Sequence, residues 1–158
     1  MPERAFSRRD TLSTLLLPLA ERQLIVPDVA VAELIGYRPG VPTGSLAAWD
    51  LGDITWRGRP LPLVSFEAAC GQPLPSGERV RIAVMHGIGP RLPFFGLLLQ
   101  GIPRIFRADS QLSYIDVPLA SLELAAVLAG NDVARVPDLD TLAEVILRGR
   151  LPGAEVAP

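Results

Sequence analysis

The side chains that could perform nucleophilic or acid–base catalysis are few, and His86 is central because it is the only histidine. A hydrolytic mechanism would pair it with the single thiol, Cys70, while Asp53 or Asp109 oriented the imidazole. No Gly-x-Ser-x-Gly elbow offers a serine nucleophile instead. Nothing in the spacing favours such a site, so we interpret Cys70 as a small apolar residue and His86 as a surface residue at a strand end. We predict that the protein is not an enzyme.

Metal and phosphate sites are equally poorly supported. One cysteine and one histidine cannot supply the four ligands of a structural zinc ion. The chain has no lysine and no phosphate-binding P-loop, and Gly87-Ile88-Gly89 is too short a glycine motif to replace one. The acid pairs Asp50/Asp53 and Asp138/Asp140 are typical of turns and helix caps. We therefore expect no cofactor and no metal.

Composition indicates a folded protein of short strands and many turns. Of 158 residues, 49% are apolar and 20% charged, which is enough apolar surface for a core, and 14 glycines and 16 prolines supply the turns. The net charge of −2 and the scattered arginines argue against nucleic-acid binding. A single cysteine gives no internal disulfide and no sign of an oxidising compartment. The apolar run after Ser7-Arg8-Arg9 is interrupted by Pro18 and lacks a cleavage site, so we expect neither export nor membrane insertion.

Alternation of apolar and polar residues predicts eight to ten short strands, which is typical of barrels or a sandwich. The expected strands are Leu12–Leu19, Leu24–Val26, Asp53–Trp56, Arg59–Phe66, Arg79–His86, Phe94–Gln100, Ile102–Phe106 as a continuation beyond Gly101, Leu112–Val117 and Val133–Val136. Asp28–Ile35 fits either extended chain or a helical turn, and periodicity does not decide between them.

A few short helices are expected between and after the strands. Ser45–Asp50 would begin at an N-cap serine, Glu67–Gly71 would end at its glycine, and Ala120–Ala129 has high helical propensity. Asp140–Arg148 has Leu142, Val145 and Ile146 on one face and Gly149 just beyond its end.

Two segments of the chain resemble the CheW family of chemotaxis adaptors. Val31-Ala32-Glu33-Leu34-Ile35 resembles the family's Val-x-Glu-Ile segment, and 52–64, Gly-Asp-Ile-Thr-Trp-Arg-Gly-Arg-Pro-Leu-Pro-Leu-Val, is similar to its Gly-x-x-Asn-Leu-Arg-Gly signature. Phe95–Ile102 occupies the place of a later family strand. The chain departs from the family pattern where Thr55 and Trp56 replace Asn and Leu, and where Ser65 and Gln100 replace aspartates. Asp132–Asp140 also reproduces the family's C-terminal glycine-containing strand pair poorly.

The resemblance implies a mainly all-β fold of two SH3-like, five-stranded β-barrel lobes that share a core, with a few short helices including one near the C-terminus. It implies one such domain over residues 12–150, between a polar tail at 1–11 and a tail at 151–158. The implied function is a non-catalytic adaptor, cytoplasmic and associated with receptor arrays at the inner membrane. It would couple a CheA-type histidine kinase to the cytoplasmic tip of a methyl-accepting chemotaxis receptor. With these departures, the chain resembles the auxiliary adaptors of pilus-motility chemosensory systems. The expected function therefore extends to type IV pilus twitching motility.

The same resemblance assigns the site residues. Val31, Glu33, Gly52 and Arg57 would form the receptor groove and kinase interface, although core packing for Val31 and a structural role for Arg57 remain open alternatives. Gly58 would supply the positive φ of a tight turn, and Pro62 would send Leu61 and Leu63 to one face. A second reading is a stand-alone SH3-like or OB-like barrel that binds a peptide or nucleic acid, for which only Trp49, Trp56, Arg57 and Arg59 offer an aromatic, basic face.

Overall fold

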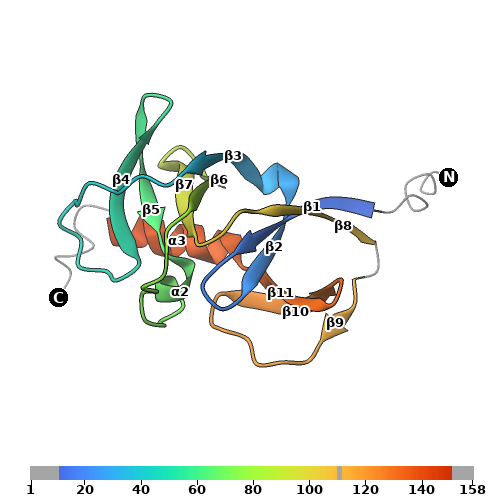
Figure 1. Ribbon diagram of the computed structural model, residues 1–158. Coiled ribbons are helices and arrows are strands. Elements are labelled where there is room, and N and C mark those ends of the chain that lie inside the picture. The colour runs from blue at the N-terminus through green and yellow to red at the C-terminus, as the bar shows by residue number, and fades with distance from the viewer. Residues whose placement is uncertain (1–10, 110–111, 151–158) are drawn as a thin grey trace.

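The computed structural model describes residues 11–109 and 112–150, which form two β-sheets, two α-helices and one 3₁₀ helix (Figure 1). The predicted tails lie outside the described residues, except that Thr11 begins the first strand. The mainly β fold with two lobes and a C-terminal helix confirms the predicted fold class. None of the helices in 11–109 and 112–150 is both long and apolar enough to cross a lipid bilayer.

The first lobe is a six-stranded sheet in the order β8-β1-β2-β11-β10-β9. Its strands come from the two ends of the chain, and β2 and β11 join them as a parallel pair. The two N-terminal strands were predicted and pair as a hairpin, and Pro27 stands at the end of β2, where its missing N–H disturbs the ladder least. The bounds are β1 Thr11–Pro18, β2 Gln23–Pro27, β8 Arg104–Asp109, β9 Tyr114–Ile115, β10 Glu123–Ala129 and β11 Asp132–Pro137.

The second lobe is a five-stranded sheet in the order β3-β6-β7-β5-β4, formed by one continuous stretch of chain. Figure 1 shows its β4–β5 hairpin extending beyond the rest of the fold. The 3₁₀ helix η1 leads into β3, so the undecided segment Asp28–Ile35 contains both structures. The bounds are η1 Asp28–Ala30, β3 Val31–Gly36, β4 Asp50–Trp56, β5 Arg59–Val64, α2 Phe66–Ala69, β6 Arg81–Ile88 and β7 Leu92–Leu99.

A shared core holds the lobes together. It contains Leu17 and Leu24 from the first sheet and Phe95 and Leu97 from the second, each fully or almost fully buried. The C-terminal helix α3, Leu139–Arg150, adds Leu142 and Ile146 to the same core and packs against β6. Each lobe also has its own small core, and Leu61 and Leu63 share that of the second lobe, as predicted. The helix therefore completes a shared core in which the two sheets bury the inner faces that neither could bury alone.

Two predicted helices are wrong. Ala120–Ala129 is mostly strand β10, because pairing with β9 and β11 buries Val127 and Ala129 and outweighs the helical propensity of its Ala, Leu and Glu residues. Ser45–Asp50 is a turn that leads into β4, in which the Ser45 hydroxyl accepts a hydrogen bond from the Ala47 N–H at 3.3 Å.

Three element boundaries also differ from the prediction. The segment Ile102–Phe106 does not continue β7, because β8 crosses to the other sheet and pairs with β1. The connection between the predicted strands Arg79–His86 and Phe94–Gln100 is shorter than expected, since β6 runs to Ile88 and β7 begins at Leu92. Gly149 lies inside α3, where a Cβ atom would stand 2.7 Å from the ring of Trp49, so close packing rather than helix termination explains this glycine.

Candidate partner-binding surface

The tip of the β4–β5 hairpin is a two-residue turn formed by Arg57 and Gly58. Both residues have positive φ, at 51° and 77°, which is the backbone of the turn that best matches the twist of paired strands. The prediction for Gly58 is confirmed, whereas the left-handed backbone of Arg57 was not expected. A non-glycine residue there is strained by about 1 kcal/mol or more. The turn therefore projects a guanidinium group into solvent at some cost in stability.

Glu33 connects this tip to the opposite edge of the same sheet. Its Oε1 accepts hydrogen bonds from Trp56 Nε1 at 2.8 Å and from Arg57 at 3.1 Å. Glu33 lies on β3 and its two partners lie at the end of β4, although β3 and β4 are the outermost strands of the sheet. The contacts therefore close the sheet into a barrel at a seam between its edges. Arg38 adds a further link across the seam by donating to the Thr55 carbonyl at 2.8 Å.

Aromatic rings pack beneath the exposed tip. Trp56 is almost buried and meets Phe94 edge-to-face at 4.8 Å between centroids. Arg57 lies over the Trp56 ring at 4.8 Å, and Arg59 over the Phe94 ring at 5.3 Å. His86, the cross-strand partner of Phe94, lies beside that ring and is exposed. The surface formed by Glu33, Trp56, Arg57, Arg59, His86 and Phe94 is called the seam surface below.

Gly52 lies at the other end of β4 and is buried in a bulge. Its φ is +98°, and a Cβ atom would come within 2.5 Å of the Val41 carbonyl oxygen. Two hydrogen bonds between Val41 and Asp53 hold the neighbouring chain against this bulge. Pro62 faces the bulge from β5 and is buried there, where the irregular ladder tolerates its missing N–H. Gly52 therefore supports the surface from below.

Arg150, the last residue of α3, binds the same bulge. It donates to both oxygens of Asp50 at 2.6 and 2.7 Å, to Asp53 Oδ1 at 2.7 Å and to the Gly52 carbonyl at 3.3 Å. Burial disfavours the charge on the Asp50 carboxylate, but the hydrogen bonds from Arg150 and from the Gly52 N–H outweigh it and lower the pKa of Asp50. The same carboxylates raise the pKa of Arg150 against the opposing effect of burial.

The predicted site residues therefore occupy three places. Glu33 and Arg57 are in contact, Gly52 lies at the base of the same hairpin, and Val31 is half-buried at the start of β3 and packs on the shared core. Sequence reasoning missed Arg150 as a partner of the bulge. It also missed Phe94, whose ring meets Trp56 edge-to-face.

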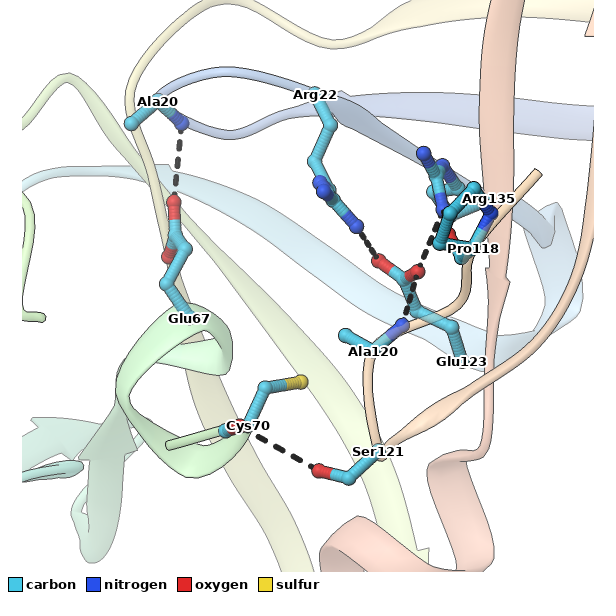
Figure 2. A network of polar contacts seen from close by, with 9 residues as sticks. All are labelled: Ala20, Arg22, Glu67, Cys70, Pro118, Ala120, Ser121, Glu123 and Arg135. Carbon is cyan, nitrogen blue, oxygen red and sulfur yellow. Dashed lines mark hydrogen bonds and ion pairs between the residues drawn. The ribbon is translucent and has the colours of Figure 1, made fainter. Parts of the chain in front are cut away.

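A separate set of polar contacts lies near the β1–β2 turn, where α2 of the second lobe meets the first lobe (Figure 2). The fully buried carboxylate of Glu123 accepts from Arg22 at 2.5 Å, from Arg135 at 2.9 Å and from the Ala120 N–H at 2.9 Å. On the α2 side, Glu67 accepts from the Ala20 N–H at 3.0 Å. The Glu123 contacts lie within the first lobe, and the bond to Glu67 links the lobes. Both carboxylates are buried and have partners, so the arrangement is structural.

The candidate catalytic pair does not form. Cys70 caps the end of α2, where the Ser121 hydroxyl donates to its carbonyl, whereas His86 stands on the seam surface. Burial raises the pKa of the Cys70 thiol, which disfavours the reactive thiolate. Within 11–109 and 112–150 no three His, Cys, Asp or Glu side chains gather as a metal site would require.

Comparison with known proteins gives a family for this arrangement. The CheW-like domain matches residues 13–146, which is most of the chain. The chain belongs to the CheW-like family. Its fold is similar to that of the scaffolding protein TtCheW from Thermoanaerobacter tengcongensis, with a TM-score of 0.71 and 14% identity over 84% of this chain and 92% of that one. No curated protein matches.

Membership in the CheW-like family accounts for the fold and supports a scaffold role in chemotaxis. Two of the chain's departures from the family pattern have clear structural roles. Ser65 is the N-cap of α2, where its hydroxyl accepts from the Ala68 N–H at 3.2 Å, a role that aspartate performs equally well. Trp56, which stands where the family has leucine, donates its indole N–H to Glu33 Oε1 at 2.8 Å and packs against Phe94.

Proposed function

We propose that this chain is a non-catalytic adaptor that couples a CheA-type histidine kinase to methyl-accepting chemotaxis receptors. The observation that carries the proposal is the CheW-like match over 13–146, because it includes both lobes and the segment that forms the seam surface. A rigid, exposed group of charged side chains held on paired strands suits protein recognition. The adaptor acts in the cytoplasm at receptor arrays.

Three of the predicted site residues contact partners in this proposal. Arg57 and Glu33 are 68% and 41% exposed at their side chains, so both remain accessible although they bind one another. Val31 is only half-buried, and the neighbouring Val29 is largely exposed, which leaves apolar surface at the start of β3. Gly52 acts indirectly, because its bulge fixes the base of the hairpin that bears Arg57.

The nucleic-acid alternative lacks the surface it requires. Base stacking needs open aromatic faces, but Trp56 is almost buried between Arg57 and Phe94. Trp49 is half-buried and packs on the shared core. We therefore favour a protein partner.

The test is binding of the purified full chain to two probes from the same organism. One is the regulatory domain of its CheA-type kinase, and the other is the cytoplasmic hairpin fragment of a chemoreceptor. Isothermal titration calorimetry should give a micromolar or tighter complex with at least one of them, weakened by Arg57→Glu but not by the same change at the distant Arg107. If neither probe binds the wild-type chain, the adaptor role is wrong.

The similarity to auxiliary adaptors extends the proposal to type IV pilus motility. Deletion of the gene should then reduce the twitching zone of a surface colony while leaving swimming in soft agar unchanged. An unchanged twitching zone, or a loss confined to swimming, would contradict the motility assignment and leave the adaptor role standing.

A further inference from the structure

Arg59 is a basic residue on the seam surface, and no carboxylate in the described part of the chain balances its charge. Its guanidinium lies over the Phe94 ring and is exposed, and within 11–109 and 112–150 no acid lies at ion-pair distance from it. The guanidinium of Arg59 donates no hydrogen bond to another residue of 11–109 or 112–150, so its N–H groups are available to a partner. Arg59 is thus positioned by an aromatic ring and still has free donors.

The charge around the hairpin tip is positive although the whole protein has a formal net charge of −2. Arg38, Arg57 and Arg59 surround it, and Glu33 is the acid that contacts them, through Arg57. Asp53, lower on β4, is bound by Arg150. The local excess of guanidinium groups attracts acidic groups to this one surface.

We propose that the seam surface binds an acidic segment of a protein partner, with a carboxylate of that segment bonded to the N–H edge of Arg59. The partner then also covers Phe94, which is half-buried in the free protein. The inference rests on the proposed adaptor function and names the chemistry of the segment that the adaptor recognises. Arg–carboxylate pairs beside an aromatic ring are well suited to this task, because the guanidinium is already oriented before binding.

The geometry favours a protein segment over a nucleic acid. A nucleic acid would need several unpaired cations along a track and open ring faces for stacking. Here Arg57 is engaged by Glu33, Arg38 is bound to the Thr55 carbonyl, and the Trp56 ring is covered. Among the described residues, Arg59 has no acidic partner and lies beside the Phe94 ring. This pair is complementary to a partner segment that carries one carboxylate next to an apolar side chain.

The experiment compares Arg59→Lys, Arg59→Gln and Arg59→Glu with Arg107→Glu, which makes the same charge change at an exposed position of β8 in the other sheet. Calorimetry at low and high salt would measure binding to the kinase regulatory domain and to the receptor hairpin fragment. A labelled oligo-dT strand is a third probe. Thermal melts would confirm that each variant is folded, as expected for a change at an exposed side chain.

We expect Arg59→Gln to weaken binding of one protein probe about threefold to fivefold, as a rim ion pair would. Arg59→Glu should weaken it by about tenfold or more, because like charges then face each other. Arg59→Lys should retain most of the affinity, Arg107→Glu should match the wild type, and the salt dependence should be smaller in Arg59→Gln.

Three results would overturn the inference while leaving the adaptor role intact. These are wild-type affinity in Arg59→Glu, an equal loss in Arg107→Glu, or binding of oligo-dT that depends on Arg59. Failure of the wild-type chain to bind either protein probe is a different result, because it removes the proposed function and this inference with it.

Discussion

Replacing Arg150 by glutamine should lower the free energy of unfolding more than neutralising any other charged residue of α3. The wild-type guanidinium makes two hydrogen bonds to Asp50, one to Asp53 and a longer one to the Gly52 carbonyl. Asp50 is the important partner, because its side chain is only 1% exposed and water cannot replace the lost donors. The variant would leave a buried carboxylate with the Gly52 N–H as its remaining strong donor.

The size of the effect follows from the exposure of each partner. Removing one member of a fully buried ion pair costs about 3–5 kcal/mol. Arg150 is 21% exposed and Asp53 33% exposed, so solvent compensates part of the loss. We therefore expect the free energy of unfolding to fall by about 2–3 kcal/mol, which lowers the melting temperature by roughly 5–10 °C in a domain of this size.

Urea unfolding followed by circular dichroism at pH 7 would measure this difference. The matched control is Arg148→Gln, since Arg148 is exposed in the same last turn of α3 and has no ion pair in the described part of the chain. The pKa of Asp50 is lower in the folded state than in the unfolded state. The stabilisation is therefore complete above the unfolded value of about 3.9 and is lost as the pH falls through the lower folded value.

Wild type and Arg150→Gln should accordingly converge in stability as the pH falls below the lowered pKa of Asp50, and Asp50→Asn should show much of the same loss at pH 7. The double variant should lose less than the sum of the two single losses. The reasoning fails if Arg150→Gln is as stable as Arg148→Gln at pH 7, or if the gap between wild type and Arg150→Gln does not narrow in acid.

Three further outcomes are expected. In urea unfolding, Gly52→Ala should lower the free energy of unfolding by about 3 kcal/mol, because the added Cβ atom meets the backbone of Val41. Gly58→Ala should lower it by only about 1 kcal/mol, because the space there is open. Equal losses would contradict the role assigned to the bulge. Trp56→Phe should lose about 1–2 kcal/mol, since Glu33 loses its indole donor, and near-wild-type stability would show that the seam bond is weak. Cys70 should react with iodoacetamide more slowly than free cysteine at pH 8, because burial raises its pKa, and a rate equal to that of free cysteine would refute this.

Strands β1, β5 and β6 are close to their expected positions, although β5 and β6 each bury four consecutive residues rather than one alternating face. Gly58 was also predictable, because a two-residue hairpin turn needs positive φ and glycine adopts it freely. β10 was not, since its Ala, Leu and Glu residues favour a helix in isolation. Its extended backbone is more stable than a helix only when β9 and β11 pair with it, and the tertiary fold determines that pairing.

The surface itself was predictable in composition but not in geometry. The resemblance named Glu33 and Arg57, yet their contact depends on the sheet curling until its two edge strands meet. Local sequence carries no signal of that closure. Arg150 was beyond reach for the same reason, because its carboxylate partners lie 97 and 100 residues earlier in the chain.

The strand order of the two sheets has a consequence for how the chain folds as it is made. Every strand of the second sheet lies between residues 31 and 99, so that sheet can assemble before translation ends. The β1–β2 hairpin leaves the ribosome first but must wait for β8 and β11, with the apolar side chains of Leu16 and Ile25 uncovered in the meantime. We therefore expect the first lobe to form last and to be the more prone to aggregate. It cannot be excised as one continuous segment, because the second lobe interrupts its sequence.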